Sequence, residues 1–519
     1  MRSHPIRPGG ARGARLPVLL VAPAVAVSAA ALIPLAYVVL ITMQTGLGTV
    51  AGLIFRPRVF ELFANTIGLL ALAIPACVAL GVGAAWLVER TDIPGRRVWA
   101  VLLAAPLVIP AFVTSYGWIT VFPSLSGLPA GVLVAALAYF PLVYLPVVAT
   151  LRRLDPALEE VAATLGRSPR RVFFGVVLPQ LRLPMLGGGL LVGLHLLAEY
   201  GAFAMLRFET FTTAIIQQYR STFNGPAAAS LAGVLVVCCL ALLLFENAAR
   251  GDGRFARIGT GAPRPQRRVR LGSIRFAAAA GAGLLVVLAV GVPMLSVARW
   301  LGIGGIDVWT EDHLVQALTQ TATLAASGAV LAVILSVPLA LLVVRFASRT
   351  SRALEATNYV TSALPGIVVA LALATITIHL AQPLYQTVVV LLVAYVLLFL
   401  PRALINIRSG IAQVPVGLEE VAQSLGKPPA VAFLRVTARL AAPAALAGGA
   451  LVFLGIVNEL TATLLLGPNG TRTLTTQFWT HVNDLDYASA APYAFLMIVL
   501  SIPMVSVLFR ASHGSMARG

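Results

Sequence analysis

The chain has 519 residues, of which 59% are hydrophobic and 11% are charged, and its mean hydropathy is +0.92. These values exclude an ordinary soluble globular protein. The formal net charge of +18 would suit a nucleic-acid-binding protein only if the basic residues formed a soluble domain. The sequence contains no such domain, so we expect no nucleic-acid partner.

Long apolar runs recur along the chain, for example at residues 17–41, 277–297 and 441–466. Each is long enough to cross a hydrocarbon layer of roughly 30 Å as a helix of about 20 residues. A membrane β-barrel would instead show short segments of alternating polarity. We therefore predict an all-α membrane protein with about twelve transmembrane helices, including the first apolar run, which is too long for a signal-peptide core. The predicted centres lie near residues 29, 75, 110, 139, 194, 236, 287, 331, 368, 393, 453 and 498.

The basic residues give an orientation to these helices. If the N-terminus is cytoplasmic, 31 of the 37 Lys and Arg residues fall in cytoplasmic segments. Those segments are 1–16, 89–97, 152–182, 247–275, 345–354, 402–440 and 510–519. Positive charge is enriched on the cytoplasmic side of membrane proteins, where it meets anionic lipid headgroups. We therefore expect a multi-pass protein in contact with membrane lipid and with both termini in the cytoplasm.

The chain repeats itself. "LEEVAATLG" at residues 158–166 returns as "LEEVAQSLG" at 418–426, and "VIPAFV" around Pro110 returns as "ALPGIV" around Pro365. A stretch rich in Gly, Pro and Arg separates the two halves and predicts a cytoplasmic linker at 250–275. We predict a first repeat at 1–249 and a second at 276–519, each with six spans. Because six is even, the repeats are parallel, and their loops at 152–182 and 402–440 lie on one side.

Each repeated loop predicts two short helices joined by a turn. Gly166 and Gly426 follow the first helix, where glycine commonly ends a helix. In the first copy Val161, Leu165, Phe173 and Phe174 form an apolar ridge with no evident partner in its own half. One copy alone could rest on lipid headgroups. Two matched copies favour a docking surface for a two-fold symmetric partner.

The pattern Glu-x-Ala-x-x-x-Gly, followed by Phe and then Val-x-Leu-Pro, resembles the EAA loop of type I ABC importer permeases. The resemblance covers nearly the whole chain, as two fused permease domains. It implies that the loops couple the chain to a cytoplasmic ATPase through Glu160, Ala162, Gly166 and Phe174, and through Glu420, Ala422, Gly426 and Phe433. In the second copy Ala438 and Arg439 replace Leu-Pro, so the end of that motif has diverged.

The resemblance also implies partners and a location. No P-loop occurs in the sequence, because "GKPP" at Gly426 lacks the required residues. We therefore expect a transport permease, not an enzyme, that binds no cofactor itself. Two copies of a separate ABC ATPase would bind the ATP. A periplasmic or lipid-anchored solute-binding protein would deliver the cargo to the inner membrane of a bacterial cell.

Two acidic residues fall within predicted spans, Glu199 and Glu459, and they are 260 positions apart. An ionisable group in hydrocarbon costs at least ~2.5 kcal/mol, so each should face a cavity or a partner. They could form helix–helix hydrogen bonds, hold a gate, or line the translocation pathway and touch a metal cargo transiently. His195 lies on the same helical face as Glu199 and is a further pathway candidate. Its counterpart is Gly455, so ordinary packing is the alternative for this histidine.

The stretches at 198–215 and 458–476 resemble those of ferric iron importer permeases, which are also single fused chains. Fe³⁺ prefers oxygen ligands, which paired glutamates would supply. Thiamine, polyamine, phosphonate and sulfate importers remain alternatives. A gradient-driven secondary transporter, with the glutamates and His195 as a proton relay, is a rival from another class. A secondary transporter does not need two matched docking loops. A structural envelope protein would leave both the duplication and the buried acids unexplained.

Overall fold

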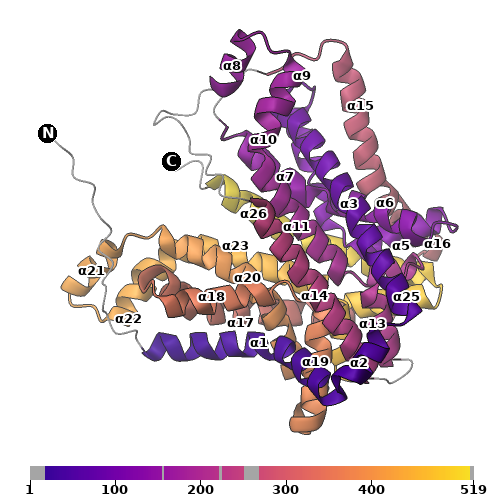
Figure 1. Ribbon diagram of the computed structural model, residues 1–519, viewed down its shortest axis with the longest axis vertical. Coiled ribbons are helices and arrows are strands. Elements are labelled where there is room, and N and C mark those ends of the chain that lie inside the picture. The colour runs from indigo at the N-terminus through magenta and orange to yellow at the C-terminus, as the bar shows by residue number, and fades with distance from the viewer. Residues whose placement is uncertain (1–17, 155–156, 221–224, 251–267, 515–519) are drawn as a thin grey trace. The chain divides into compact units, whose positions relative to one another are not determined.

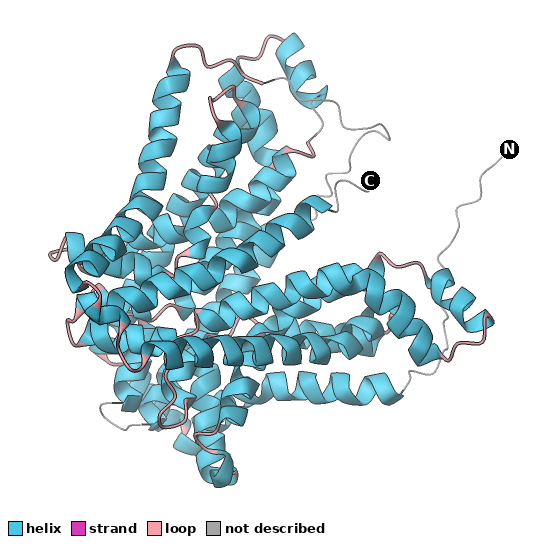
Figure 2. Cartoon of the chain, turned by 180° about the vertical axis from the view of Figure 1, so that it is seen from behind, coloured by secondary structure: helices cyan, strands magenta, loops and turns pink. Residues whose placement is uncertain are grey.

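The structure is a computed structural model that describes residues 18–154, 157–220, 225–250 and 268–514. The predicted N-terminal cytoplasmic segment, residues 515–519 of the predicted C-terminal one and the larger part of the predicted linker lie outside these residues. Figures 1 and 2 show a chain built from helices. Within the described ranges there is no β-strand, and backbone pairing of the β type is limited to one parallel bridge between Thr91 and Val269. The predicted all-α class is confirmed.

The described helices account for the predicted spans. Nine of them are long and apolar enough to cross a membrane, and three bent pairs raise the number to twelve. The bends are 93° between the segments 96–108 and 111–121, 63° between 170–180 and 182–198, and 102° between 349–361 and 366–380. Pro110 and Pro365 stand immediately before α5 (Ala111–Val121) and α19 (Gly366–Leu380). Because proline cannot donate a backbone hydrogen bond, it suits the start of a helix after a bend.

The chain folds into two compact units, which we describe separately. Unit 1 contains Met1–Ile41, Glu311–Gln477 and Val499–Gly519, and unit 2 contains Thr42–Thr310 and Phe478–Ile498. Neither unit coincides with one sequence repeat, because each includes segments from both halves of the chain. The repeat boundaries at 1–249 and 276–519 therefore describe the sequence duplication, and they stay a prediction.

Unit 2 holds most of the first repeat and the start of the second. Its elements are α2 (Leu47–Ile54), α3 (Pro57–Arg90), α4 (Arg96–Leu102), η1 (Ala105–Val108), α5, α6 (Gly127–Tyr139), α7 (Pro141–Leu151), α8 (Ala157–Thr164), α9 (Pro169–Val172), η2 (Phe173–Val177), α10 (Leu178–Gln180), α11 (Arg182–Ala198), α12 (Gly201–Met205), α13 (Phe211–Arg220), α14 (Gly225–Arg250), α15 (Ile274–Val286), η3 (Val287–Gly291), α16 (Val292–Gly304) and η4 (Asp307–Trp309).

The 34-residue helix α3 is central to unit 2, where it packs against α6, α7 and α11. Small residues allow the close approach. A methyl group at Gly81 would lie only 2.8 Å from the Cβ atom of Val143, and one at Gly193 would lie 3.1 Å from the end of Ile74. Such small-residue contacts are usual between membrane helices, where close packing replaces the hydrophobic effect.

Unit 1 repeats this arrangement with the later elements. These are α17 (Leu314–Arg345), α18 (Arg349–Thr361), α19, η5 (Gln382–Leu384), α20 (Val388–Ala412), α21 (Val416–Ser424), α22 (Pro429–Ala432), η6 (Phe433–Thr437), α23 (Ala438–Val457) and α24 (Thr461–Leu466). Three helices continue from one unit into the other, namely α1 (Val18–Thr45), α25 (Leu474–Asn483) and α26 (Tyr487–Gly514).

The long helix of unit 1 is α17, which packs against α20 and α23. A methyl group at Gly328 of α17 would lie 2.5 Å from the side chain of Ile456 in α23. The N-terminal helix α1 joins this unit through polar contacts: Tyr37 lies 3.0 Å from the hydroxyl of Thr375, and the Asn358 amide donates to Ser28 at 2.9 Å. Figure 1 places α21 at one end of this bundle.

Candidate functional site

The repeated loops fold as predicted, with a short helix, a glycine turn and a second helix. In the first copy Gly166 follows the end of α8 at Thr164 and has a φ of +76°, and in the second copy Gly426 follows the end of α21 at Ser424 and has a φ of +81°. The backbone N–H groups of Arg167 and Lys427 donate to Ala162 and Ala422, five residues back, at 3.2 Å in both copies. This is the usual glycine-terminated helix end, in which left-handed backbone closes the last turn.

Both loops expose the same apolar ridge. The exposed fractions are 46% and 45% for Leu158 and Leu418, 57% and 57% for Val161 and Val421, 76% and 75% for Leu165 and Leu425, and 65% and 64% for Phe174 and Leu434. Four large apolar side chains on so short a segment are costly to leave in water. Their near-identical exposure in the two copies makes the two ridges equivalent surfaces.

The predicted coupling residues divide by their burial. Glu160 and Glu420 are exposed and face away from the bundle, whereas Ala162 is buried and Ala422 is half-buried. The structural register also corrects one equivalence. The π-helical turns η2 and η6 align Phe433 with half-buried Phe173, so the counterpart of exposed Phe174 is Leu434.

Glu199 lies at the break between α11 and α12 in unit 2. Its Oε1 atom accepts a hydrogen bond from the backbone N–H of Ala202 at 2.9 Å, and its Oε2 atom accepts one from the Tyr139 hydroxyl at 2.7 Å. The Thr212 hydroxyl donates to the Glu199 carbonyl oxygen at 2.7 Å. The carboxylate therefore caps a short helix whose first N–H groups would otherwise lack partners.

Glu459 does the same in unit 1, at the break between α23 and α24. Its Oε1 atom accepts hydrogen bonds from the N–H of Ala462 at 2.9 Å and from the Thr461 hydroxyl at 2.6 Å. The hydroxyls of Thr463 and Thr475 donate to its carbonyl oxygen at 2.9 and 3.2 Å. Gly366, the first residue of α19, leaves room for the carboxylate, because a methyl group there would lie 3.1 Å from Oε1.

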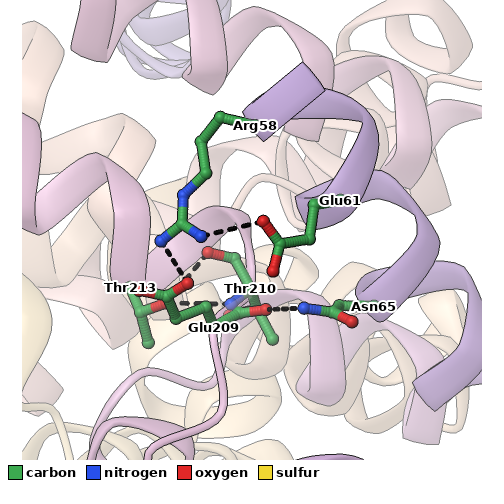
Figure 3. Close-up of polar contacts among 6 residues, drawn as sticks. All are labelled: Arg58, Glu61, Asn65, Glu209, Thr210 and Thr213. Carbon is green, nitrogen blue, oxygen red and sulfur yellow. Dashed lines mark hydrogen bonds and ion pairs between the residues drawn. The ribbon is translucent and has the colours of Figure 1, made fainter. Parts of the chain in front are cut away.

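The loop after each capped helix is fastened to the start of the long helix of its unit. Figure 3 shows the first copy, in which Arg58 of α3 contacts Glu61 and Glu209, and the Asn65 amide donates to the Glu209 carbonyl at 3.1 Å. In the same view the Thr213 hydroxyl is bound to the backbone of Thr210.

The second copy uses α17 in the same way. The N–H of Arg472 donates to the Gln320 side-chain oxygen at 2.8 Å, and the N–H of Leu474 donates to the Thr321 hydroxyl at 2.8 Å. Asn65 and Gln320 are therefore equivalent anchors.

Comparisons with known proteins agree with this duplicated geometry. The family described as "Binding-protein-dependent transport system inner membrane component" matches the chain twice, at residues 44–249 and 328–513. The chain belongs to this family. It is a multi-pass inner-membrane permease of the ABC importer class, with the type I fold present in two repeats.

Several individual relatives align with this permease. The Fe(3+)-transport system permease protein FbpB 2 of Haemophilus influenzae is 37% identical over 473 residues, which is 90% of this chain and 93% of the relative. The sulfate transport system permease protein CysW of Synechocystis is 27% identical over 35% of this chain and 73% of its own length. The putrescine transport system permease protein PotI of Escherichia coli is 36% identical over 24% of this chain and 49% of its own length.

Arg402 of the permease lies inside helix α20, which continues past it to Ala412. Arg402 is also the first residue of the predicted cytoplasmic segment 402–440, and that assignment stays a prediction. Its guanidinium lies 4.9 Å from the centre of the Phe399 ring and attracts Glu459 electrostatically. Glu459 therefore has a positively charged neighbour within unit 1.

His195 belongs to the cluster around Glu199. Its Nδ1 atom lies 2.8 Å from the Leu191 carbonyl oxygen, and its ring packs on Tyr139 with the centroids 5.5 Å apart. Tyr139 thus contacts both predicted pathway residues of this repeat. Within the described ranges, no group of three or more His, Cys, Asp or Glu side chains could hold a metal ion.

Unit 2 of the permease contains a partly open cavity of about 410 Å³. The rings of Tyr200 and Trp479 meet in its wall with their centroids 5.0 Å apart. The described lining offers phenol, amide and guanidinium groups and no carboxylate: Tyr200, Ala204, Thr213, Ile216, Gln217, Arg220, Trp479 and Asn483. The glutamates predicted for a cationic cargo are therefore not part of this cavity's described wall.

Proposed function

We propose that this permease imports ferric iron, delivered by a periplasmic or lipid-anchored binding protein. The observation that carries the cargo assignment is the alignment with the Fe(3+)-transport permease of Haemophilus influenzae, which extends over 90% of this chain. The sulfate and putrescine permeases described above align over 35% and 24% of it. An alignment through both repeats includes the two glutamate-capped breaks, whereas the shorter alignments span less than half of the chain.

The energy source in this proposal is a pair of separate ABC ATPases that bind and hydrolyse ATP, so the permease itself is not a hydrolase and binds no cofactor. One ATPase copy docks on the exposed ridge at α8, and the other docks on the exposed ridge at α21. The matched exposure of Leu165 and Leu425, at 76% and 75%, supports two equivalent docking sites. Glu160 and Glu420 are exposed beside these ridges and are free to contact the ATPase.

The same proposal places both loops and both termini in the cytoplasm. The distribution of Lys and Arg along the sequence supports this orientation. The loops that contain Glu209 and Arg472 then lie toward the outer face, where the binding protein releases its cargo.

Glu199, Glu459 and His195 stay candidates for the translocation pathway. Both carboxylates hold a break in a span, and a break exposes backbone and side-chain oxygen atoms that a hard cation could contact in passing. Arg402 limits how strongly Glu459 could retain such a cation. We therefore propose transient contact at these carboxylates instead of a stable metal site.

The test is ATP-driven uptake by proteoliposomes that contain the permease, its ATPase and its binding protein. We expect radiolabelled ferric iron to accumulate and an excess of sulfate, thiamine or putrescine to leave that uptake unchanged. Uptake of sulfate, thiamine or putrescine, without uptake of iron, would contradict the ferric iron assignment and would identify that solute as the cargo. Uptake driven by a proton gradient without ATP would instead favour the secondary-transporter reading.

A further inference from the structure

The first glutamate of each "LEEVA" segment faces a buried arginine, whereas the second is exposed. Glu159 forms an ion pair with Arg90 at 2.9 Å, and Glu419 forms one with Arg345 at 3.1 Å. The side chains are largely buried, with exposed fractions of 5% and 25% in the first pair and 13% and 18% in the second. These inward-facing glutamates are not the exposed ones that the resemblance assigned to the ATPase.

The two arginines occupy equivalent places. Arg90 is the last residue of α3 and Arg345 is the last residue of α17, the longest helix of each unit. They are 255 positions apart, and Glu159 and Glu419 are 260 positions apart, as the sequence duplication requires. Each ion pair therefore ties one short loop helix to the end of one long helix within the same unit.

Other contacts strengthen both junctions. In unit 2, the carbonyl oxygen of Arg90 accepts a hydrogen bond from Val269 at 2.8 Å. In unit 1, Arg345 also donates to the Val414 carbonyl at 3.3 Å, and the Thr437 hydroxyl donates to Glu419. Burial raises the pKa of the Glu159 carboxyl, while the nearby Arg90 opposes that shift. A buried ion pair adds little net stability over an apolar pair, so its retention in both copies calls for another role.

The far ends of the same helices are anchored as well. Asn65 of α3 binds the Glu209 carbonyl in the loop after the break at Glu199, and Gln320 of α17 binds the N–H of Arg472 in the loop after the break at Glu459. At 1.5 Å per residue, Asn65 and Arg90 are about 38 Å apart along α3. Each long helix thus joins a predicted coupling loop to a glutamate-capped break.

We propose that α3 and α17 act as struts, and that the ion pairs Arg90–Glu159 and Arg345–Glu419 are the joints that pass movement of α8 and α21 into them. The proposal deepens the proposed function, because it rests on the loops being the place where the ATPases push. Movement of α8 would then reach the loop at Glu209 through α3, and movement of α21 would reach the loop at Arg472 through α17. The four charged residues of the joints are positioning residues that do not contact cargo.

The first test does not depend on the cargo. Spin labels at Ala163→Cys in α8 and Ala79→Cys in α3, in a chain with Cys77, Cys238 and Cys239 replaced by alanine, report the distance between loop and strut. With the joint intact we expect one narrow distance distribution that ATP does not alter. In Glu159→Gln the distance distribution should become broader or should change when ATP is added. In the charge-swapped variant, Arg90→Glu combined with Glu159→Arg, the distribution should become narrow again. The same narrow distribution in Glu159→Gln would overturn the proposal.

The second readout is coupling. In Glu159→Gln combined with Glu419→Gln, we expect both ATPase copies to remain bound while uptake per inserted permease falls by about tenfold. The matched control is Glu246→Gln, which removes a buried carboxylate from a pair with Arg250 inside one helix and should leave uptake unchanged. Loss of the ATPase from the double variant would place these glutamates in docking and overturn the proposal. A wild-type system that transports no iron would contradict the cargo assignment only. The spin-label distances do not depend on the cargo, so they would still test the two ion pairs.

Discussion

At the scale of single residues, the two glutamates within the spans have the same structural role in each repeat. Glu199 and Glu459 each accept the N–H three residues ahead and close the start of a short helix. The bond from Tyr139 to Glu199 joins two helices, as the helix–helix alternative expects, whereas the side-chain bonds of Glu459 are local to its own break. A role in the pathway stays a prediction for both. The structural role needs only an oxygen that accepts the capping hydrogen bond, which a glutamine amide also provides. A role in binding a cationic cargo would also need the negative charge.

Replacing Glu199 and Glu459 with glutamine tests that separation. Glutamine keeps the acceptor for Ala202 or Ala462 and removes the negative charge. For a ferric cargo we expect uptake per inserted protein to fall by about tenfold in each single variant, equivalent to about 1.4 kcal/mol, and further in the double variant. ATPase binding should stay intact. Full normalised uptake in the double variant would exclude a carboxylate role in the pathway.

At the scale of elements, the close approach of helices depends on particular glycines of α3. A methyl group at Gly81 would lie 2.9 Å from the backbone nitrogen of Tyr144, whereas one at Gly83 would have no heavy atom within 4 Å. We expect Gly81→Ala to lower the free energy of unfolding by about 1–3 kcal/mol because α7 cannot yield. Gly83→Ala is the control and should leave stability unchanged or raise it slightly, because alanine favours a helix more than glycine does. Thermal unfolding in detergent measures both, and equal midpoints would contradict the packing of α3 on α7.

The membrane-spanning helices were predicted well from the sequence, because each of them corresponds to a long apolar run. All twelve spans were expected near the positions where the structure places them, and the glycine turns at Gly166 and Gly426 were expected as well. The sharp bends before α5 and α19 were not predicted, because hydropathy does not change at a bend between two apolar segments. The matching prolines at Pro110 and Pro365 were the available signal.

The site was predicted less completely. The duplication identified the coupling loops and the paired glutamates, because both signals are charged residues at a fixed spacing. It did not reveal that Glu159 faces a buried arginine while Glu160 is exposed. The two residues are identical and adjacent on one helix, so the sequence does not show which of them faces the rest of the unit. The matching arginines at Arg90 and Arg345 could have suggested a partner for the inward glutamates. The contacts of Arg402 depend on how α20 and α23 pack, which apolar periodicity does not specify.

At the scale of the whole molecule, the orientation of the repeats is the first property to test. Single cysteines at Ser168 and Ser424 should be shielded from an impermeant thiol reagent outside intact cells, and one at Asn469 should be labelled. All three positions are exposed in the structure, so burial within the chain cannot cause the difference. Labelling of either loop position from outside would contradict the parallel arrangement of the repeats.

The central claim is that one ATPase docks on each of the two equivalent ridges and drives transport from there. The number of ATPase copies bound to each permease tests this claim most directly. We would purify the complex and weigh it by native mass spectrometry, comparing wild type with Leu165→Glu combined with Leu425→Glu. A charge at each exposed ridge should prevent burial against the partner. The control, Leu485→Glu, alters a side chain that is 72% exposed and lies outside both loops. The account predicts two ATPase copies on wild type and the control and none on the double variant, and two copies on the double variant would contradict it.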